Sequence, residues 1–285
     1  MINFRADLHS HTYCSDGSLS PQALVELAVA SNLQALSITD HDTVAAYAQA
    51  LPLAEKLGLK LLSGIELSAY YESTTVHILG YGFDLNNIQL LDFCKRLTQA
   101  RTEGNHIILE KLKRHRFNIS EQELSEAFPN RVLGRPHIAQ LMVRKGYISS
   151  VKAAFTQYLG DKGRCTRPPL KVLSIPDAVS LIHQAGGIAV LAHPHLFKNK
   201  KLAHKILDTS NNFDGIETYY GLMPIHLEQP IMDLAKQYNL IMTGGSDFHG
   251  DLTPHLKLGC SFTCEATFEP LYTLYKKNNP FSEVI

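Results

Sequence analysis

Residues 7–17 read DLHSHTYCSDG. The first two of them are also the last two of an apolar, strand-like run, INFRADL at 2–8. His9 and His11 are two residues apart, so in an extended strand both imidazoles point to the same face. One metal ion can therefore bind both rings. Similar apolar runs recur, and most also carry a His or a carboxylate at or near their end; they cover 35–40, 59–67, 75–82, 187–193, 213–219 and 240–247. This repetition predicts strands that bring their polar ends to one shared site.

Helical patterns lie between most of these runs. They begin at Ser20-Pro21, Thr43, Ile175 and His226, and Gly58 and Gly186 are typical residues after a helix end. Strands that alternate with helices predict an α/β fold with a parallel sheet, open or closed into a barrel. Seven strand candidates favour a TIM-like barrel, in which the chemistry lies at the carboxyl ends of the strands.

The charge of the chain is unevenly distributed. The whole sequence has 27 Lys+Arg and 27 Asp+Glu, but residues 95–171 have 16 and 6, which leaves 11 and 21 elsewhere. Residues 88–171 also offer helical patterns and no strand candidate. We therefore predict a barrel made of 1–87 and 172–285, which carries a basic helical insertion at 88–171. The equal totals of basic and acidic residues argue against a protein whose whole surface is basic for nucleic acid, and against a polybasic membrane anchor.

Localisation is predicted from what the sequence lacks. No apolar run approaches the ~20 residues of a membrane helix, and the start of the chain does not resemble a secretory signal. Five cysteines form no CxxC pair, which is typical of reduced thiols. These patterns predict a cytoplasmic protein.

The polar residues at the strand ends are candidate metal ligands. Asp247 and His249 repeat the two-residue spacing of the first pair, and the two oxygens of Glu66 can bridge two ions. A single histidine at a strand end is more often structural than a ligand, but so many imidazoles and carboxylates at one end of a barrel need a cation to balance them. His and carboxylate side chains bind Mn²⁺, Zn²⁺ or Fe²⁺. The candidates at or near the strand ends are Asp7, His9, His11, Asp16, Asp40, His41, Asp42, Glu66, His77, His193, Glu217, Asp247 and His249.

The motifs DLHSHTYCSDG, TDHD, GIE, HILGYG, AHP and GSDFH, in this order, resemble the PHP (polymerase and histidinol phosphatase) family. The segment GRPHIAQLMVRKGYISS at 134–150 is similar to that of a subgroup of stand-alone bacterial phosphoesterases, the RNase AM or TrpH-like proteins. The resemblance implies a distorted (β/α)7 barrel with two to three divalent ions, Mn²⁺ foremost. It implies a first metal bound by His9, His11, Glu66 and Asp247, a second by Glu66, His77 and His193, and a third by Asp16, His41 and His249.

Further residues receive roles around these ligands. We interpret Asp7, Asp40 and Glu217 as groups that orient imidazoles, whereas Cys14 and His195 receive no role. Arg135 and His137 open a helix in the GRPH segment, so they are candidates for substrate binding. Weaker candidates of the same kind are Arg101, Arg164 and Arg167.

The expected reaction is phosphate ester hydrolysis, with water that bridges two metals as the nucleophile and no catalytic side chain. The subgroup resemblance implies release of the 3′-phosphate from nucleoside 3′,5′-bisphosphates or 5′-to-3′ removal of nucleotides from short RNA. The alternatives are a histidinol-phosphate phosphatase and a PHP module without activity. The predicted partner is a nucleotide or a short single-stranded RNA, and the sequence indicates no protein partner and no membrane.

Overall fold

The computed structural model describes residues 4–72, 74–129, 131–160, 162–166, 173–199, 201–209 and 212–280. Within these residues seven strands form one sheet, ordered as in the chain. They are β1 (Ala6–Asp7), β2 (Ala35–Ile38), β3 (Lys60–Tyr71), β4 (Thr74–Tyr81), β5 (Ile188–Leu191), β6 (Gly215–Tyr220) and β7 (Ile241–Gly245). Each predicted strand is therefore confirmed.

Backbone contacts between the first and last strands close the sheet into a barrel. Leu8 N donates a hydrogen bond to Gly244 O at 3.3 Å, and Asp247 N donates to His9 O at 2.8 Å. The two backbone segments approach so closely that a Cβ on Gly245 would lie 2.4 Å from the backbone nitrogen of His9. Glycine is needed here because the backbone of the first strand fills the space of a side chain. The expected TIM-like α/β barrel is confirmed.

The strand β4 runs antiparallel to both of its neighbours, which corrects the expectation of a wholly parallel sheet. β3 ends at Tyr71 and β4 begins at Thr74. That connection is too short for the crossover helix of a parallel pair, so the two strands form a hairpin. The reversal places the first half of β4 at the end of the barrel where the parallel strands have their carboxyl ends. His77, which pairs in register with Ser68, is thereby brought to the shared site.

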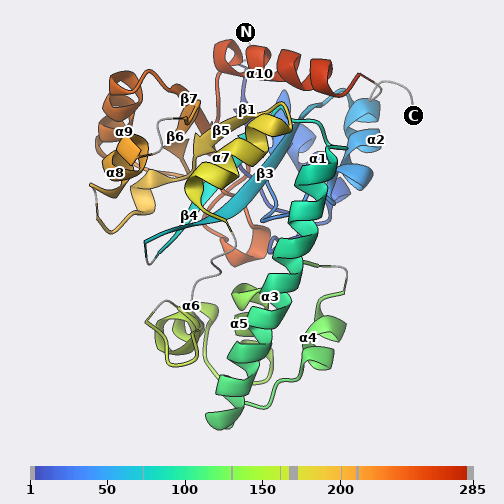
Figure 1. Cartoon of the computed structure of the whole chain (residues 1–285). Helices are drawn as coiled ribbons and strands as arrows, with labels where there is room; N and C mark the ends of the chain where they lie inside the picture. The colour runs from blue at the N-terminus through green and yellow to red at the C-terminus, as the bar shows by residue number, and fades with distance from the viewer. Residues whose placement is uncertain are drawn as a thin grey trace.

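Six helices within the described residues surround or close the barrel. α10 lies across one end of it, opposite the helices that follow β4 (Figure 1). Its Phe268, Leu271 and Tyr275 pack into one core cluster with Ala6 and Leu8. This packing closes one end of the barrel and leaves the other for chemistry. The helices are α1 (Pro21–Ala30), α2 (Tyr47–Leu57), α7 (Ile175–Gln184), α8 (Leu202–Thr209), α9 (Ile225–Gln237) and α10 (Glu265–Asn278).

Residues 88–166 form helices and turns, and no strand occurs among those that the structure describes there. The elements are α3 (Ile88–Arg114), α4 (Glu121–Ala127), α5 (Arg135–Arg144), α6 (Val151–Ala154) and a π-helical turn at Phe155–Leu159. The first half of α3 packs on the barrel, while its second half extends away and carries a lobe with α4–α6 (Figure 1). That lobe has a core of its own, in which Ile108 and Leu112 meet Ile138 and Met142. In the described part of the chain, no helix is long and apolar enough to cross a membrane.

Candidate metal centre

The structure gathers all nine predicted ligands at the open end of the barrel. They come from the segments that follow β1, β2, β5 and β7 and from the hairpin of β3 and β4. Among these nine side chains the most exposed is His77, at 27%, and the imidazoles of His9 and His11 are fully buried. Parallel strands end at one rim of a barrel, so residues far apart in the chain meet there.

A first group consists of His9, His11, Glu66 and Asp247. The Nε2 atom of His9 lies 3.3 Å from Glu66 Oε2 and 3.2 Å from Asp247 Oδ1. The Nε2 atom of His11 lies 3.2 Å from each of the same two oxygens. Two nitrogens and two oxygens thus face a common centre, as tetrahedral coordination of a small divalent cation requires.

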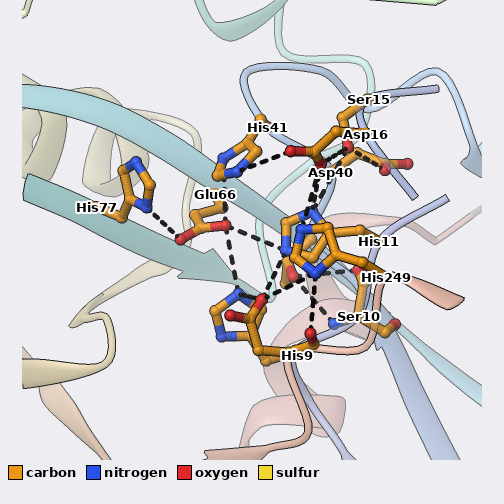
Figure 2. Close-up of polar contacts among 12 residues, drawn as sticks. His9, Ser10, His11, Ser15, Asp16, Asp40, His41, Glu66, His77 and His249 are labelled. Atoms are coloured by element: carbon orange, nitrogen blue, oxygen red, sulfur yellow. Dashed lines mark hydrogen bonds and ion pairs between the residues drawn. The ribbon is translucent and has the colours of Figure 1, made fainter. Parts of the chain in front are cut away.

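The second oxygen of Glu66 points to a different set of rings. Glu66 Oε1 lies 2.8 Å from His77 Nδ1 and 2.9 Å from His193 Nε2, and these two nitrogens are 3.4 Å apart. Figure 2 shows the Glu66 carboxylate between His77 on one side and His41 and His11 on the other. One carboxylate therefore serves two neighbouring groups, which is the geometry of a bridging ligand.

A third group lies on the side of the loop after β1. Asp16 Oδ1 is 3.3 Å from His249 Nε2, and Asp16 Oδ2 is 3.7 Å from His41 Nε2. Asp16 Oδ1 is also 3.6 Å from His11 Nδ1. Four side chains that could hold a metal ion therefore converge here.

The charges in this end of the barrel favour a bound cation. Burial opposes ionisation of Glu66, but His41 and His77 hold its pKa well below the usual range. Burial likewise disfavours the protonated form of His11, yet Asp247 and Glu66 raise its pKa to about 10. Among the described residues, the buried His11 Nε2 and His41 Nδ1 have no hydrogen-bond partner, although carboxylate oxygens lie 3.2 Å away. Imidazole nitrogens and carboxylate oxygens that converge on a buried centre fit a divalent metal, whose binding would release the protons of the imidazoles.

Three carboxylates were predicted to orient imidazoles, and Glu217 does so. Its Oε1 lies 2.8 Å from His9 Nδ1, and its Oε2 accepts a hydrogen bond from the backbone nitrogen of His193 at 2.7 Å. The interpretation of Asp7 is corrected, whereas Asp40 reaches the imidazole of His11 through Ser15, whose Oγ donates to Asp40 Oδ1 at 2.6 Å and lies 3.5 Å from His11 Nδ1. Asp7 accepts from backbone nitrogens that join β1 to β7, and Asp40 accepts from the loop after β1. These two buried carboxylates satisfy N–H and O–H donors that the barrel closure would otherwise leave unpaired.

Sequence reasoning missed Tyr220. Its hydroxyl donates to Asp247 Oδ2 at 2.7 Å, which leaves Asp247 Oδ1 to face the two imidazoles of the first group. The ring of Tyr220 stacks on His195, with centroids 5.7 Å apart. His195, which received no role, is buried, and its Nε2 lies 3.1 Å from Thr218 O. A tyrosine inside a strand carries no sequence pattern that marks such a contact.

The helical lobe contacts the loops that carry the ligands. Val132 N donates to Cys14 O at 3.1 Å. Arg101 of α3 donates through Nε to Asp42 Oδ2 at 2.9 Å and through Nη2 to Ser68 Oγ at 2.8 Å. Arg101 is 17% exposed and Asp42 is fully buried, so this ion pair fixes α3 beside the ligand His41.

The predicted substrate residues lie at the start of α5. Arg135 is partly buried and donates through Nη1 to Leu159 O at 3.2 Å. His137 is fully buried, and its Nδ1 accepts a hydrogen bond from Gly134 N at 3.1 Å. Arg164 faces the Tyr158 ring at 5.9 Å, and Arg167 lies outside the described residues. Cys14 is buried.

Comparison with known proteins identifies the family. A family model described as PHP domain matches residues 7–162, more than half of the chain. The chain belongs to the PHP domain family. This PHP chain is 31% identical over 279 residues to the 5′-3′ exoribonuclease Rnm of Escherichia coli (strain K12), and the match covers 95% of the chain and 94% of that relative.

Two further proteins extend the PHP assignment. The 3′,5′-nucleoside bisphosphate phosphatase of Chromobacterium violaceum is 29% identical over 85% of the chain and 86% of that relative. A solved structure from Bifidobacterium adolescentis, described as a candidate metal-dependent phosphoesterase, matches with a TM-score of 0.86 and 29% identity, over 94% of this chain and 96% of that one. The predictions of a PHP fold and of a hydrolase of the metal-dependent phosphoesterase class are confirmed.

Proposed function

We propose that this PHP phosphoesterase hydrolyses phosphate esters of nucleotides. The substrates are the 3′-phosphate of nucleoside 3′,5′-bisphosphates, the 5′ end of short single-stranded RNA, or both. The observation that carries the proposal is the convergence of eight histidines and carboxylates, joined by His193 through Glu66, beside a basic helical lobe. The names of the relatives, an exoribonuclease and a nucleoside bisphosphate phosphatase, support the same substrate class.

The nine side chains would bind two to three divalent ions. The first group would bind one ion, Glu66 with His77 and His193 a second, and Asp16 with His41 and His249 a third. The distances of 2.8–3.7 Å among their nitrogen and oxygen atoms support this division. His and carboxylate ligands suit Mn²⁺, with Zn²⁺ or Fe²⁺ as alternatives. Bound ions would neutralise a phosphate and lower the pKa of water.

Two carboxylates prepare this site. Glu66 uses both oxygens, so it fixes the spacing of the first and second groups. Glu217 holds the ring of His9 through Nδ1, which leaves Nε2 directed at the first group. Because no serine, cysteine or histidine nucleophile is proposed, hydrolysis depends on how rigidly these residues hold their positions.

Residues 88–171 would act as a cap over the barrel end. The hydrogen bond from Val132 to Cys14 and the ion pair of Arg101 with Asp42 support this role, because both tie the lobe to ligand-bearing loops. Arg135 would contact a substrate phosphate from the first turn of α5. The buried His137 would act from inside the lobe and fix the start of that helix.

A substrate panel tests the proposal. The purified protein is loaded with Mn²⁺ and assayed with adenosine 3′,5′-bisphosphate, a 5′-phosphorylated oligoribonucleotide and histidinol phosphate. We expect turnover of at least one of the first two, much faster than of the third. Arg135→Ala should lower this activity while the metal content stays constant. Preference for histidinol phosphate, or no turnover at all with metal bound, would contradict the proposal.

A further inference from the structure

Two arginines of the helical lobe lie against one aromatic ring. The guanidinium carbon of Arg144 is 4.6 Å from the Phe128 ring centroid, and that of Arg131 is 5.5 Å from it. The two cationic groups are therefore at most about 10 Å apart, the sum of these distances. Arg131 is half-buried and Arg144 is exposed.

No carboxylate neutralises this pair within the part of the chain that the structure describes. Elsewhere in the lobe a cation does pair with an acid, as Lys145 does with Glu123. Burial, and then the charge of Arg144, lower the pKa of Arg131. Two like charges held close together repel each other, so an anion between them would stabilise the arrangement.

The pair lies beside the candidate metal centre. Arg131 also faces the ring of Tyr13, at 5.5 Å from its centroid, and the next residue, Val132, bonds to the carbonyl of Cys14. Tyr13 and Cys14 belong to the loop between His11 and Asp16, which are both predicted ligands. A chain that enters the metal centre could therefore continue past this loop onto the two arginines.

We propose that Arg131, Arg144 and Tyr13 form a second subsite, which binds the single-stranded RNA that continues beyond the nucleotide being cleaved. The guanidinium groups would bind a phosphodiester, and the half-buried Tyr13 ring with Arg131 offers a surface on which a base stacks. This inference rests on the proposed function. We expect the subsite to favour oligonucleotides, because these carry phosphodiesters and bases beyond the nucleotide at the metals.

The test compares two double variants that remove the same charge. Arg131→Gln/Arg144→Gln removes the subsite, and Lys113→Gln/Arg114→Gln removes two exposed charges from the far end of α3. Each is assayed with a 5′-phosphorylated oligoribonucleotide and with adenosine 3′,5′-bisphosphate. For the subsite variant we expect the KM for the oligonucleotide to rise about tenfold, a loss in the range for one stacked base. The KM for the bisphosphate should stay within about twofold, and the control variant should behave as the unmodified protein.

A binding measurement keeps the result independent of turnover. Fluorescence anisotropy follows the affinity for a 2′-O-methyl phosphorothioate oligonucleotide, which resists cleavage, over a series of KCl concentrations. The slope of log affinity against log salt should become shallower by about 0.7 for each phosphate that the variant no longer neutralises. Arg131→Lys/Arg144→Lys should retain most of the slope.

The outcomes separate the subsite from the proposed function. Unchanged oligonucleotide KM and affinity would overturn the subsite, as would an equal loss in the control variant or an equal rise in the bisphosphate KM. If the unmodified protein cleaves neither substrate, the proposed function fails. The anisotropy series then decides the subsite alone, because a selective loss of affinity supports it and an unchanged affinity overturns it.

Discussion

The barrel end and the helical lobe use charge in opposite ways. At the barrel end, carboxylates and imidazoles are buried or half-buried, and paired nitrogen and oxygen atoms lie within 3.7 Å of each other on segments that the sheet holds in place. On the lobe, Arg131 and Arg144 are partly or fully exposed and lie against an aromatic ring. This contrast has a physical reason: bond cleavage needs atoms held in fixed positions, whereas attraction of a polyanion needs only accessible positive charge.

Removal of the bridging carboxylate should have the largest effect on metal binding and activity at the barrel end. In Glu66→Gln one neutral amide replaces an anion shared by two ligand groups. We expect metal content measured by mass spectrometry to fall and phosphoesterase activity to drop by more than about 100-fold, beyond the loss caused by changing an outer hydrogen-bond partner. Glu26→Gln, at an exposed position of α1, is the control. Full metal content in the Glu66 variant would refute the bridging role.

The contact between the two regions should depend on one buried ion pair. Arg101→Ala leaves the fully buried Asp42 without its cation, so the free energy of unfolding should fall by about 3 kcal/mol. Lys95→Ala removes the exposed pair with Asp92 on the same helix and should change it by less than about 1 kcal/mol. Denaturant titration measures both. Equal losses would mean that Arg101 contributes no more than a surface charge.

The hydroxyl of Tyr220 should affect metal affinity through the position of Asp247. Tyr220→Phe removes the donor to Asp247 Oδ2 and keeps the ring. We expect the affinity for Mn²⁺ to fall about tenfold with unchanged thermal stability in the metal-free protein. Calorimetric titration gives the affinity, and Tyr219→Phe on the same strand is the matched control. An unaltered affinity would show that Asp247 is positioned without Tyr220.

The smallest expected effect concerns the core of the lobe. Burial lowers the pKa of His137 from 6.5 to about 4, so the unfolded chain takes up a proton before the folded one. Stability is therefore lost as the pH falls from about 6.5 towards about 4, and none is lost above this window. When the pH falls from 7.5 to 5.5, the free energy of unfolding should decrease by about 1 kcal/mol less in His137→Asn than in the unmodified protein. Denaturant midpoints of the metal-free proteins measure this, and identical pH dependences would exclude the titration.

Much of this protein could be predicted from local patterns. The alternation of apolar runs predicted each strand, and Ser20 begins a helix as its capping pattern indicates. α10 was not predicted, because its N-cap Cys264 makes no side-chain capping bond. The antiparallel β4 was missed because the gap before Thr74 was not recognised as a hairpin turn.

The ligand types and their place at strand ends could be predicted from the chain alone, because strand periodicity and residue chemistry are local properties. The charge counts also predict an acidic barrel and a basic insertion. Three contacts became visible only in the folded protein: each oxygen of Glu66 faces its own rings, Tyr220 supports Asp247, and two arginines share Phe128. These contacts join residues distant in the chain, and closure of the barrel and packing of the lobe, rather than spacing, bring them within reach.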